Sequence, residues 1–145
     1  MLKMAEFPAP VESARVRPRI TPESEPFHGG LRNGLLRLPK CSGCGRLHTP
    51  PVASCSYCCA AVGWVECEGG GSVHSWVRYH RAFMSEFEGV VPYCVVTVQL
   101  DEGVRLFGRW LSSDEPRIGC RVQAVGERWN DGFCGLGFEP RPAPI

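Results

Sequence analysis

The sequence has little lysine, little net charge and no long apolar run, and each shortage narrows the possible functions. Its only lysines are Lys3 and Lys40, and its 145 residues carry a formal net charge of +1. This balance provides no general attraction to nucleic acid or to an acidic membrane surface. No apolar run approaches the ~20 residues that span a bilayer, so we expect no membrane partner and no nucleic-acid partner.

Cysteine, by contrast, is abundant, and its nine residues bear on the cellular compartment. The first residues contain no apolar core of a secretory leader, and cysteines that bind a metal as thiolates must stay reduced. We therefore expect a cytoplasmic protein. Hydrophobic residues make up 43% of the chain and charged residues 21%, which is typical of a globular fold.

Two Cys-x-x-Cys pairs predict a metal site. The first pair is Cys41 and Cys44, and the second is Cys55 and Cys58. Two intervening residues let the chain turn and aim both sulfurs at one ion, and four thiolates make a closed structural site whose default metal is zinc. Iron in a rubredoxin-like site suits the same ligands. Because a zinc ion held by four sulfurs has no open position for water, we expect a scaffold or a docking surface and no metal catalysis.

The first 38 residues divide into an arm and a helix region. Residues 1–20 contain three prolines, alternating arginines and no apolar period, which predicts a flexible arm. A helix is expected to follow, with Thr21 as its cap, Pro22 in its first position and Gly34 at its end. Residues 35–40 alternate like a strand that leads into the first cysteine pair.

The second half of the chain predicts short strands separated by turns. A strand at 64–68 ends at three glycines, which form a turn or a bulge. Five further strands are expected at 72–79, 93–100, 104–111, 120–128 and 133–138, and in the first of them Val73, Ser75 and Val77 are predicted to share one face. Five strands with almost no helix favour a mainly β fold with a small closed barrel of the OB type, although an SH3-like barrel fits the same count. The expected segments are a flexible N-terminal arm (1–20), an N-terminal helix region (21–38), a zinc ribbon (39–62), an OB-fold domain (63–140) and a C-terminal tail (141–145).

The connection at 80–92 is long and carries Phe83, Met84 and Phe87. It is either a candidate contact surface or a loop that folds its own aromatic rings against the barrel. His80 and Arg81 suit a polar contact to phosphate, ribose or a partner carboxylate, or are an ordinary solvated pair. Elsewhere, Cys67, Cys94, Cys120 and Cys134 lie in or beside predicted strands and are expected to be small buried residues rather than nucleophiles. His80 with Cys94 or Cys67 is the only catalytic pairing that the sequence suggests, so we expect no catalysis by this chain alone.

Several spaced motifs together resemble the DUF35 family, over about residues 21–140. These motifs are the Thr21-Pro22-Glu23-Ser24 helix start with Phe27, the Cys41-Ser42-Gly43-Cys44-Gly45 pair, the glycine-rich turn into Ser72-Val73-His74-Ser75-Trp76, the run Tyr79-His80-Arg81-Ala82-Phe83, Pro92-Tyr93, and Gly137-Phe138-Glu139-Pro140. Two positions depart from the family pattern. Cys59 follows the second pair where glycine is common, and Gly29-Gly30 replace an expected aromatic and acidic pair.

The resemblance implies a rubredoxin-like zinc ribbon joined to an OB-fold, in an accessory subunit of a thiolase-like enzyme. Structural zinc would be held by Cys41, Cys44, Cys55 and Cys58, and the partner would carry the catalytic residues. This chain would assemble with that partner as a hetero-oligomer and help to bind a coenzyme A thioester in a degradative, β-oxidation-like pathway. Contacts to the acyl-CoA or to the partner would come from His80, Arg81, Phe83 and Phe87. The alternatives are a single-stranded nucleic-acid-binding OB-fold, a partner of an enoyl-CoA hydratase-like protein, and an iron-containing redox protein.

Overall fold

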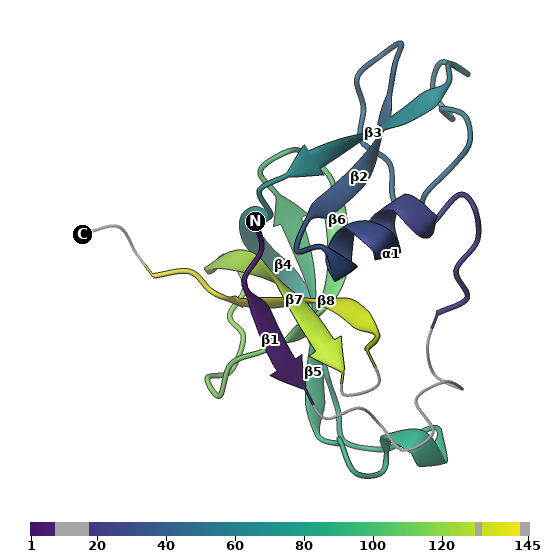
Figure 1. Ribbon diagram of the computed structural model, residues 1–145. Helices are drawn as coiled ribbons and strands as arrows, with labels where there is room; N and C mark the ends of the chain where they lie inside the picture. The colour runs from purple at the N-terminus through teal and green to yellow at the C-terminus, as the bar shows by residue number, and fades with distance from the viewer. Residues whose placement is uncertain (8–17, 130–131, 143–145) are drawn as a thin grey trace.

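The computed structural model describes residues 1–7, 18–129 and 132–142 and has two stacked parts beside one short helix (Figure 1). At one end, β2 (Leu36–Cys41) and β3 (Val62–Cys67) form an antiparallel hairpin. Below it lies the barrel of β4 (Gly70–Tyr79), β5 (Tyr93–Leu100), β6 (Arg105–Trp110), β7 (Arg121–Trp129) and β8 (Cys134–Pro140). In the described residues no helix is long and apolar enough to cross a membrane.

The barrel closes through a fixed order of strand pairs. Strands β4, β5 and β6 pair in antiparallel fashion, β8 runs parallel to β6 and antiparallel to β7, and β7 pairs with β4 to close the ring. This five-stranded barrel with one short helix and a four-cysteine hairpin confirms the predicted fold class, a zinc-ribbon-like unit joined to an OB-fold. The strand predicted at 93–100 is confirmed as β5, in which every second side chain is buried.

The predicted strand at 64–68 exists as β3, but it pairs with β2 and belongs to the ribbon rather than to the barrel. The chain leaves β3 at Gly69, whose φ of +84° favours glycine. A Cβ atom at this position would lie 2.5 Å from the Cβ of Ala124 in β7. Gly69 therefore lets the chain turn tightly against the barrel just before β4 begins at Gly70.

The N-terminal residues differ from the predicted flexible arm. Met4–Phe7 form β1, a strand parallel to β7 in which Met4 is opposite Gly126. The preceding Leu2 is buried, and its N–H donates to the carbonyl of Gly34 at 2.6 Å. The short apolar start of the chain was missed because its partner strand lies more than a hundred residues away. The rest of the predicted arm, residues 8–17, lies outside the described residues.

The helix α1 (Glu25–Arg32) begins later than predicted. Thr21 lies in a turn before the helix, where its N–H donates to the Ser24 hydroxyl oxygen at 2.9 Å. The residue at the N-cap position is Ser24 and not the predicted Thr21. The end is as predicted, because Asn33 caps the helix and Gly34 follows with a φ of +72°. The hairpin, the helix and the barrel share one core, in which Leu31, Leu36 and Leu38 join the barrel side chains around Phe138.

A β-bulge overturns the predicted faces of β4. The register to β5 shifts between Val73 and Ser75, so His74 is the extra residue. Val73 is buried as predicted, but beyond the bulge the faces exchange: Trp76 packs against the core while Val77 is 45% exposed. The period-2 pattern of the sequence carries no signal for the extra residue, so the prediction continued the wrong face.

Candidate metal centre and outer barrel face

The four cysteines of the two pairs come together at the tip of the ribbon. Each pair turns in the same way: the Gly45 N–H donates to the Cys41 carbonyl at 3.1 Å, and the Cys59 N–H donates to the Cys55 carbonyl at 2.9 Å. Backbone N–H groups then point at the first sulfur of each pair, at 3.3 Å from Gly43 to Cys41 and at 3.3 Å from Tyr57 to Cys55. These turns aim both sulfurs of a pair to the same side.

The spacing of the sulfurs fits a tetrahedral ion. All four Sγ atoms lie within 4.8 Å of one another, with 3.3 Å between Cys41 and Cys58 and 3.7 Å between Cys44 and Cys55. Zinc–sulfur bonds of about 2.3 Å give a tetrahedron with edges of about 3.8 Å. The donor set is therefore able to hold a zinc-sized ion with small adjustments, and four thiolates suit zinc or iron.

The thiols of Cys41, Cys55 and Cys58 ionise unequally in the protein alone. Backbone hydrogen bonds, that of Cys44 foremost, lower the pKa of Cys41 to about 6. Burial opposes ionisation of Cys55, but the N–H groups of Cys58 and Tyr57 outweigh it and lower its pKa. The N–H of Ala60 favours the Cys58 thiolate, yet the neighbouring sulfurs and burial raise the pKa of Cys58 to about 11. A divalent cation removes this conflict because it stabilises all four thiolates together.

Cys59 stands apart from the cluster. It has a φ of +64°, which explains the preference for glycine after such a pair, and its side chain is exposed. Beside the cluster, the guanidinium of Arg46 lies 4.1 Å from the centre of the Tyr57 ring. The centres of the His48 and Tyr57 rings are 6.1 Å apart. These contacts brace the two turns against each other.

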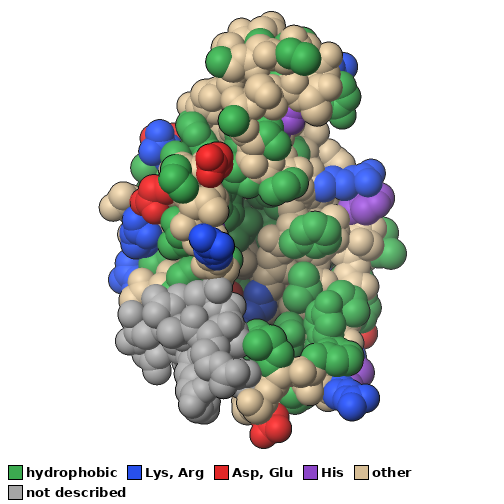
Figure 2. Space-filling model, turned by 90° about the vertical axis from the view of Figure 1, so that its right-hand side faces the viewer, with side chains coloured by type: hydrophobic (Ala, Val, Ile, Leu, Met, Phe, Trp, Pro, Cys, Tyr) green, Lys and Arg blue, Asp and Glu red, His purple; other side chains and the backbone are tan. Residues whose placement is uncertain are grey.

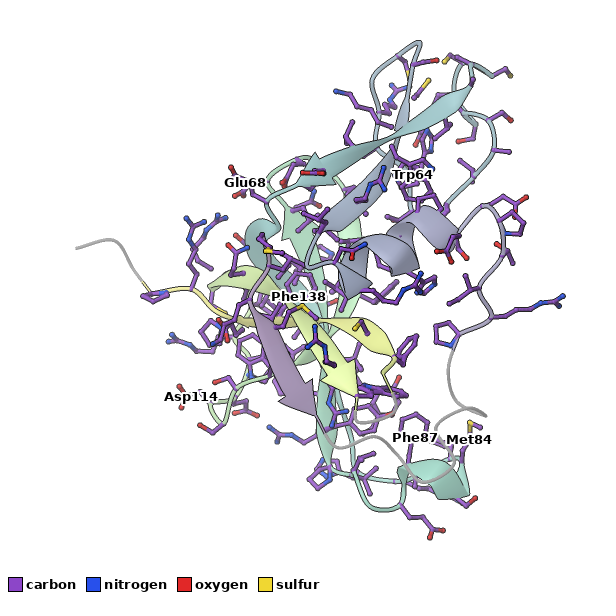
Figure 3. All side chains as sticks on the ribbon, viewed as in Figure 1. Trp64, Glu68, Met84, Phe87, Asp114 and Phe138 are labelled. Carbon is purple, nitrogen blue, oxygen red and sulfur yellow. The ribbon has the colours of Figure 1, made fainter. Side chains whose placement is uncertain are left out.

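The predicted contact residues of the 80–92 connection gather at the far end of the barrel. Phe87 lies in η2 (Ser85–Phe87), and its ring stacks on Tyr93 at 5.8 Å. Tyr93 stacks on Tyr79 at 5.1 Å, and Phe83 meets Tyr79 edge-on at 6.5 Å. Figure 3 places Met84 and Phe87 at this end of the molecule, and Figure 2 shows hydrophobic side chains gathered there. The connection thus packs the Phe87 ring against Tyr93 of β5 and leaves Phe83 76% exposed.

The polar pair of this connection does not form one site with the rings. His80 and Arg81 are exposed, and the Arg81 guanidinium lies 5.8 Å from the centre of the Phe83 ring. His80 instead lines a cavity of about 610 Å³ together with Arg78, Cys94 and Trp110. The structure therefore leaves Arg81 beside the aromatic cluster of Phe83 and Phe87, and only His80 of the four predicted contact residues lines the neighbouring cavity.

Comparisons with known proteins agree with this architecture. The family model described as the ChsH2 C-terminal OB-fold domain matches residues 64–127. A solved structure named Ltp2-ChsH2(DUF35) aldolase contains a chain that is 28% identical, with a TM-score of 0.75 over 86% of this chain and 98% of that one. A DUF35 domain-containing scaffold protein of Methanocaldococcus jannaschii is 28% identical over 71% of this chain and 78% of its own.

The chain belongs to the DUF35 family. It is also similar to a probable enoyl-CoA hydratase alpha subunit of Thermomonospora curvata, with 32% identity over 66% of this chain. The DUF35 chain spans only 30% of the length of that relative, whereas it spans most of the scaffold protein.

Of the cysteines outside the DUF35 ribbon tip, two lie in the catalytic pairings that the sequence suggested. Cys94 and His80 line the same cavity, but the Cys94 side chain is buried in the barrel core. Cys67 lies in β3, away from that cavity, and burial raises the pKa of its thiol to about 11. Neither thiol has a hydrogen bond to a histidine among the described residues, so a thiol–imidazole pair has no support.

One charged pair of the DUF35 barrel was missed from the sequence. Glu127 in β7 is buried, and Arg109 in β6 reaches it at 3.4 Å across β8, where Gly135 and Gly137 carry no side chain. Burial raises the pKa of Glu127, against the opposing effects of Arg109 and of the Trp129 N–H. The two glycines of β8, spaced by one residue, were the only sequence signal for this crossing.

Proposed function

We propose that this chain is a non-catalytic DUF35 accessory subunit that pairs with a thiolase-like enzyme, a thiolase or a retro-aldolase. The partner would act on acyl-CoA thioesters in a degradative, β-oxidation-like pathway, and this chain would support assembly and acyl-CoA binding. The observation that carries the proposal is the likeness to the chain of the Ltp2-ChsH2(DUF35) aldolase over 98% of that chain's length. The match spans the ribbon as well as the barrel, so the two proteins share the whole arrangement.

In this proposal Cys41, Cys44, Cys55 and Cys58 hold a structural zinc ion. Their sulfurs converge within 4.8 Å, and backbone N–H groups already support two of them. Zinc binding of this kind contributes about 10–16 kcal/mol in model peptides, which is enough to order a segment with few buried side chains. The ion would thus keep the ribbon tip folded as a surface for the partner.

The arrangement of the remaining residues favours an accessory role over catalysis. The candidate nucleophile Cys94 is buried, and a catalytic cysteine requires a nearby base and access for its substrate. His80 and Arg81 are exposed and free to approach a phosphate or a carboxylate, while Phe83 and Phe87 offer apolar contact. We assign these four residues to contacts with the acyl-CoA or the partner, and the catalytic groups to the partner.

A hydratase-like partner is the second candidate. The probable enoyl-CoA hydratase alpha subunit is 32% identical to this chain, but the match covers 30% of its length. In that case a separate polypeptide would supply the remainder of the hydratase. The DUF35 chain would again be an accessory subunit of an enzyme that acts on an acyl-CoA thioester.

The test is a tagged pull-down from the native host at moderate salt, with bound proteins identified by mass spectrometry. We expect a thiolase-like protein in near-stoichiometric amount. A hydratase-like protein in its place would favour the second candidate. Turnover of an acyl-CoA thioester by the purified chain alone would refute the accessory role, and an empty pull-down with salt-dependent binding of single-stranded oligonucleotides would favour a nucleic-acid function instead.

A further inference from the structure

The outward-facing residues of β4, β5 and β6 form cross-strand rows that carry several apolar side chains beside polar ones, since Val95 also pairs with Arg109 and Thr97 with Ser75. Directly paired residues of antiparallel strands place their side chains on the same face. Val77 pairs with Val95, Tyr79 pairs with Tyr93, and Thr97 of the next outward row pairs with Phe107. The alternate positions of β5, such as Val96 and Val98, are fully buried in the barrel. These rows therefore lie on the outside of the barrel.

We define the outer face as these rows together with Phe83 and Met84. The two residues of the 80–92 connection extend the rows because Phe83 contacts Tyr79. Phe107 is 73% exposed and Phe83 76%, and Val77 and Met84 are also exposed. A sheet that faces water usually carries polar residues at its outward positions. Apolar side chains along three adjacent strands and one connection are typical of a surface that another protein covers.

The charges around the outer face indicate the kind of partner. Arg105 lies beside Phe107, and its guanidinium donates to the neutral amide oxygen of Gln99 at 3.0 Å. Arg81 lies against the ring of Phe83. Among the described residues neither arginine has a carboxylate within ion-pair distance, and the rows themselves contain no acidic residue. A partner with an apolar patch and acidic residues at its edge complements this face.

The same charges disfavour a second copy of this chain as the occupant. In a two-fold dimer the outer face would meet itself, and both partners would contribute arginines without a carboxylate to pair with. A heteromeric partner has no such restriction. The structural likeness to a chain named as part of an Ltp2-ChsH2(DUF35) aldolase points the same way.

We infer that the outer face is the surface on which the thiolase-like partner docks, through an apolar patch with an acidic edge. This inference rests on the proposed function and adds the surface to it. The exposed rings of Phe107 and Phe83 would be the main apolar contacts, because buried aromatic side chains dominate the energetics of most interfaces. Arg81 and Arg105 would orient the partner and accelerate its association.

The test compares three exposed positions in the full chain. Wild type, Phe107→Asp, Phe83→Asp and the control Ile118→Asp are purified, and their affinity for the thiolase-like protein captured by the wild-type chain is measured by biolayer interferometry. Ile118 is 72% exposed, much like Phe107, but lies in the connection between β6 and β7. Thermal melts check that all variants fold. We expect the two phenylalanine variants to weaken binding by roughly tenfold or more and the control to bind as wild type.

The outcomes separate the surface from the function. If the partner binds wild type and both phenylalanine variants equally, the outer face is not the docking surface, while the proposed function stands. If wild type captures no thiolase-like protein, the proposed function fails and this inference fails with it. If the chain alone forms a concentration-dependent dimer in sedimentation and Phe107→Asp dissolves it, the face is a self-interface and the heteromeric assignment is wrong.

Discussion

Replacement of Leu38 by alanine tests whether the ribbon and the barrel form one cooperative unit. Leu38 lies in β2, whose partner strand is β3 of the ribbon, but its side chain is 1% exposed and belongs to the core around Phe138. Truncation of a fully buried leucine usually costs about 3–5 kcal/mol, from lost burial and from the cavity that remains. Because the cavity would open in the shared core, we expect the loss to destabilise the barrel as well as the hairpin.

The assay follows urea unfolding with two probes, far-UV circular dichroism for the strands and release of zinc for the ribbon. With a slope of about 2 kcal/mol per molar urea, the expected loss lowers the unfolding midpoint by about 1.5–2.5 M. Both probes should shift together, because a single core unfolds as one transition. The matched control is Val52→Ala in the ribbon loop, where the side chain is 36% exposed and a change within about 0.5 kcal/mol is expected. If Leu38→Ala shifts zinc release alone and leaves the strand signal at its wild-type midpoint, the two parts unfold independently and the reasoning is wrong.

Further predictions concern the metal, the buried carboxylate and one close approach. Cys55→Ser should reduce the zinc content measured by plasma mass spectrometry from one ion per chain to a small fraction, and visible absorbance of the wild type would indicate iron instead. Burial raises the pKa of Glu127 in the folded state above its value in the unfolded chain. This group therefore stabilises the fold most at pH values below the ordinary carboxyl pKa, and its contribution is lost as the pH rises through the pKa of the folded state. Glu127→Gln should make the free energy of unfolding, measured with urea, depend less on pH over this range. Gly71→Ala should cost at least about 2 kcal/mol in thermal or urea unfolding, because the added Cβ would lie 2.5 Å from the Gln99 carbonyl oxygen in the neighbouring strand; an unchanged midpoint would contradict the close approach.

The parts of the fold that were predictable depend on local patterns. The strand at 93–100 was predicted with the bounds that β5 has, because this run is rich in residues that favour strands. The turn after it was expected from Asp101-Glu102-Gly103, and Gly103 has a φ of +104°. The convergence of the four cysteines followed from spacing alone, since each pair is set by a turn of a few residues.

The parts that were missed depend on contacts between distant segments. The pairing of β1 with β7 joins the two ends of the chain, and no local pattern marks it. Phe107 was not singled out because its place beside Thr97 requires the register between β5 and β6. The crossing of Arg109 to Glu127 likewise depends on which strand separates β6 from β7.

The extra residue in β4 has a consequence for how the gene can change. Val73 pairs with Val98 and Ser75 pairs with the next residue of β5, Thr97, so deletion of codon 74 would leave a regular ladder with Trp76 still toward the core and Val77 still outward. Substitutions at this exposed position leave the phase intact. Deletion of any one residue from Ser75 to Tyr79, with the bulge kept, would instead move every later side chain of the strand to the opposite face. Single-residue gaps in this strand should therefore fall at position 74 more often than at positions 75–79.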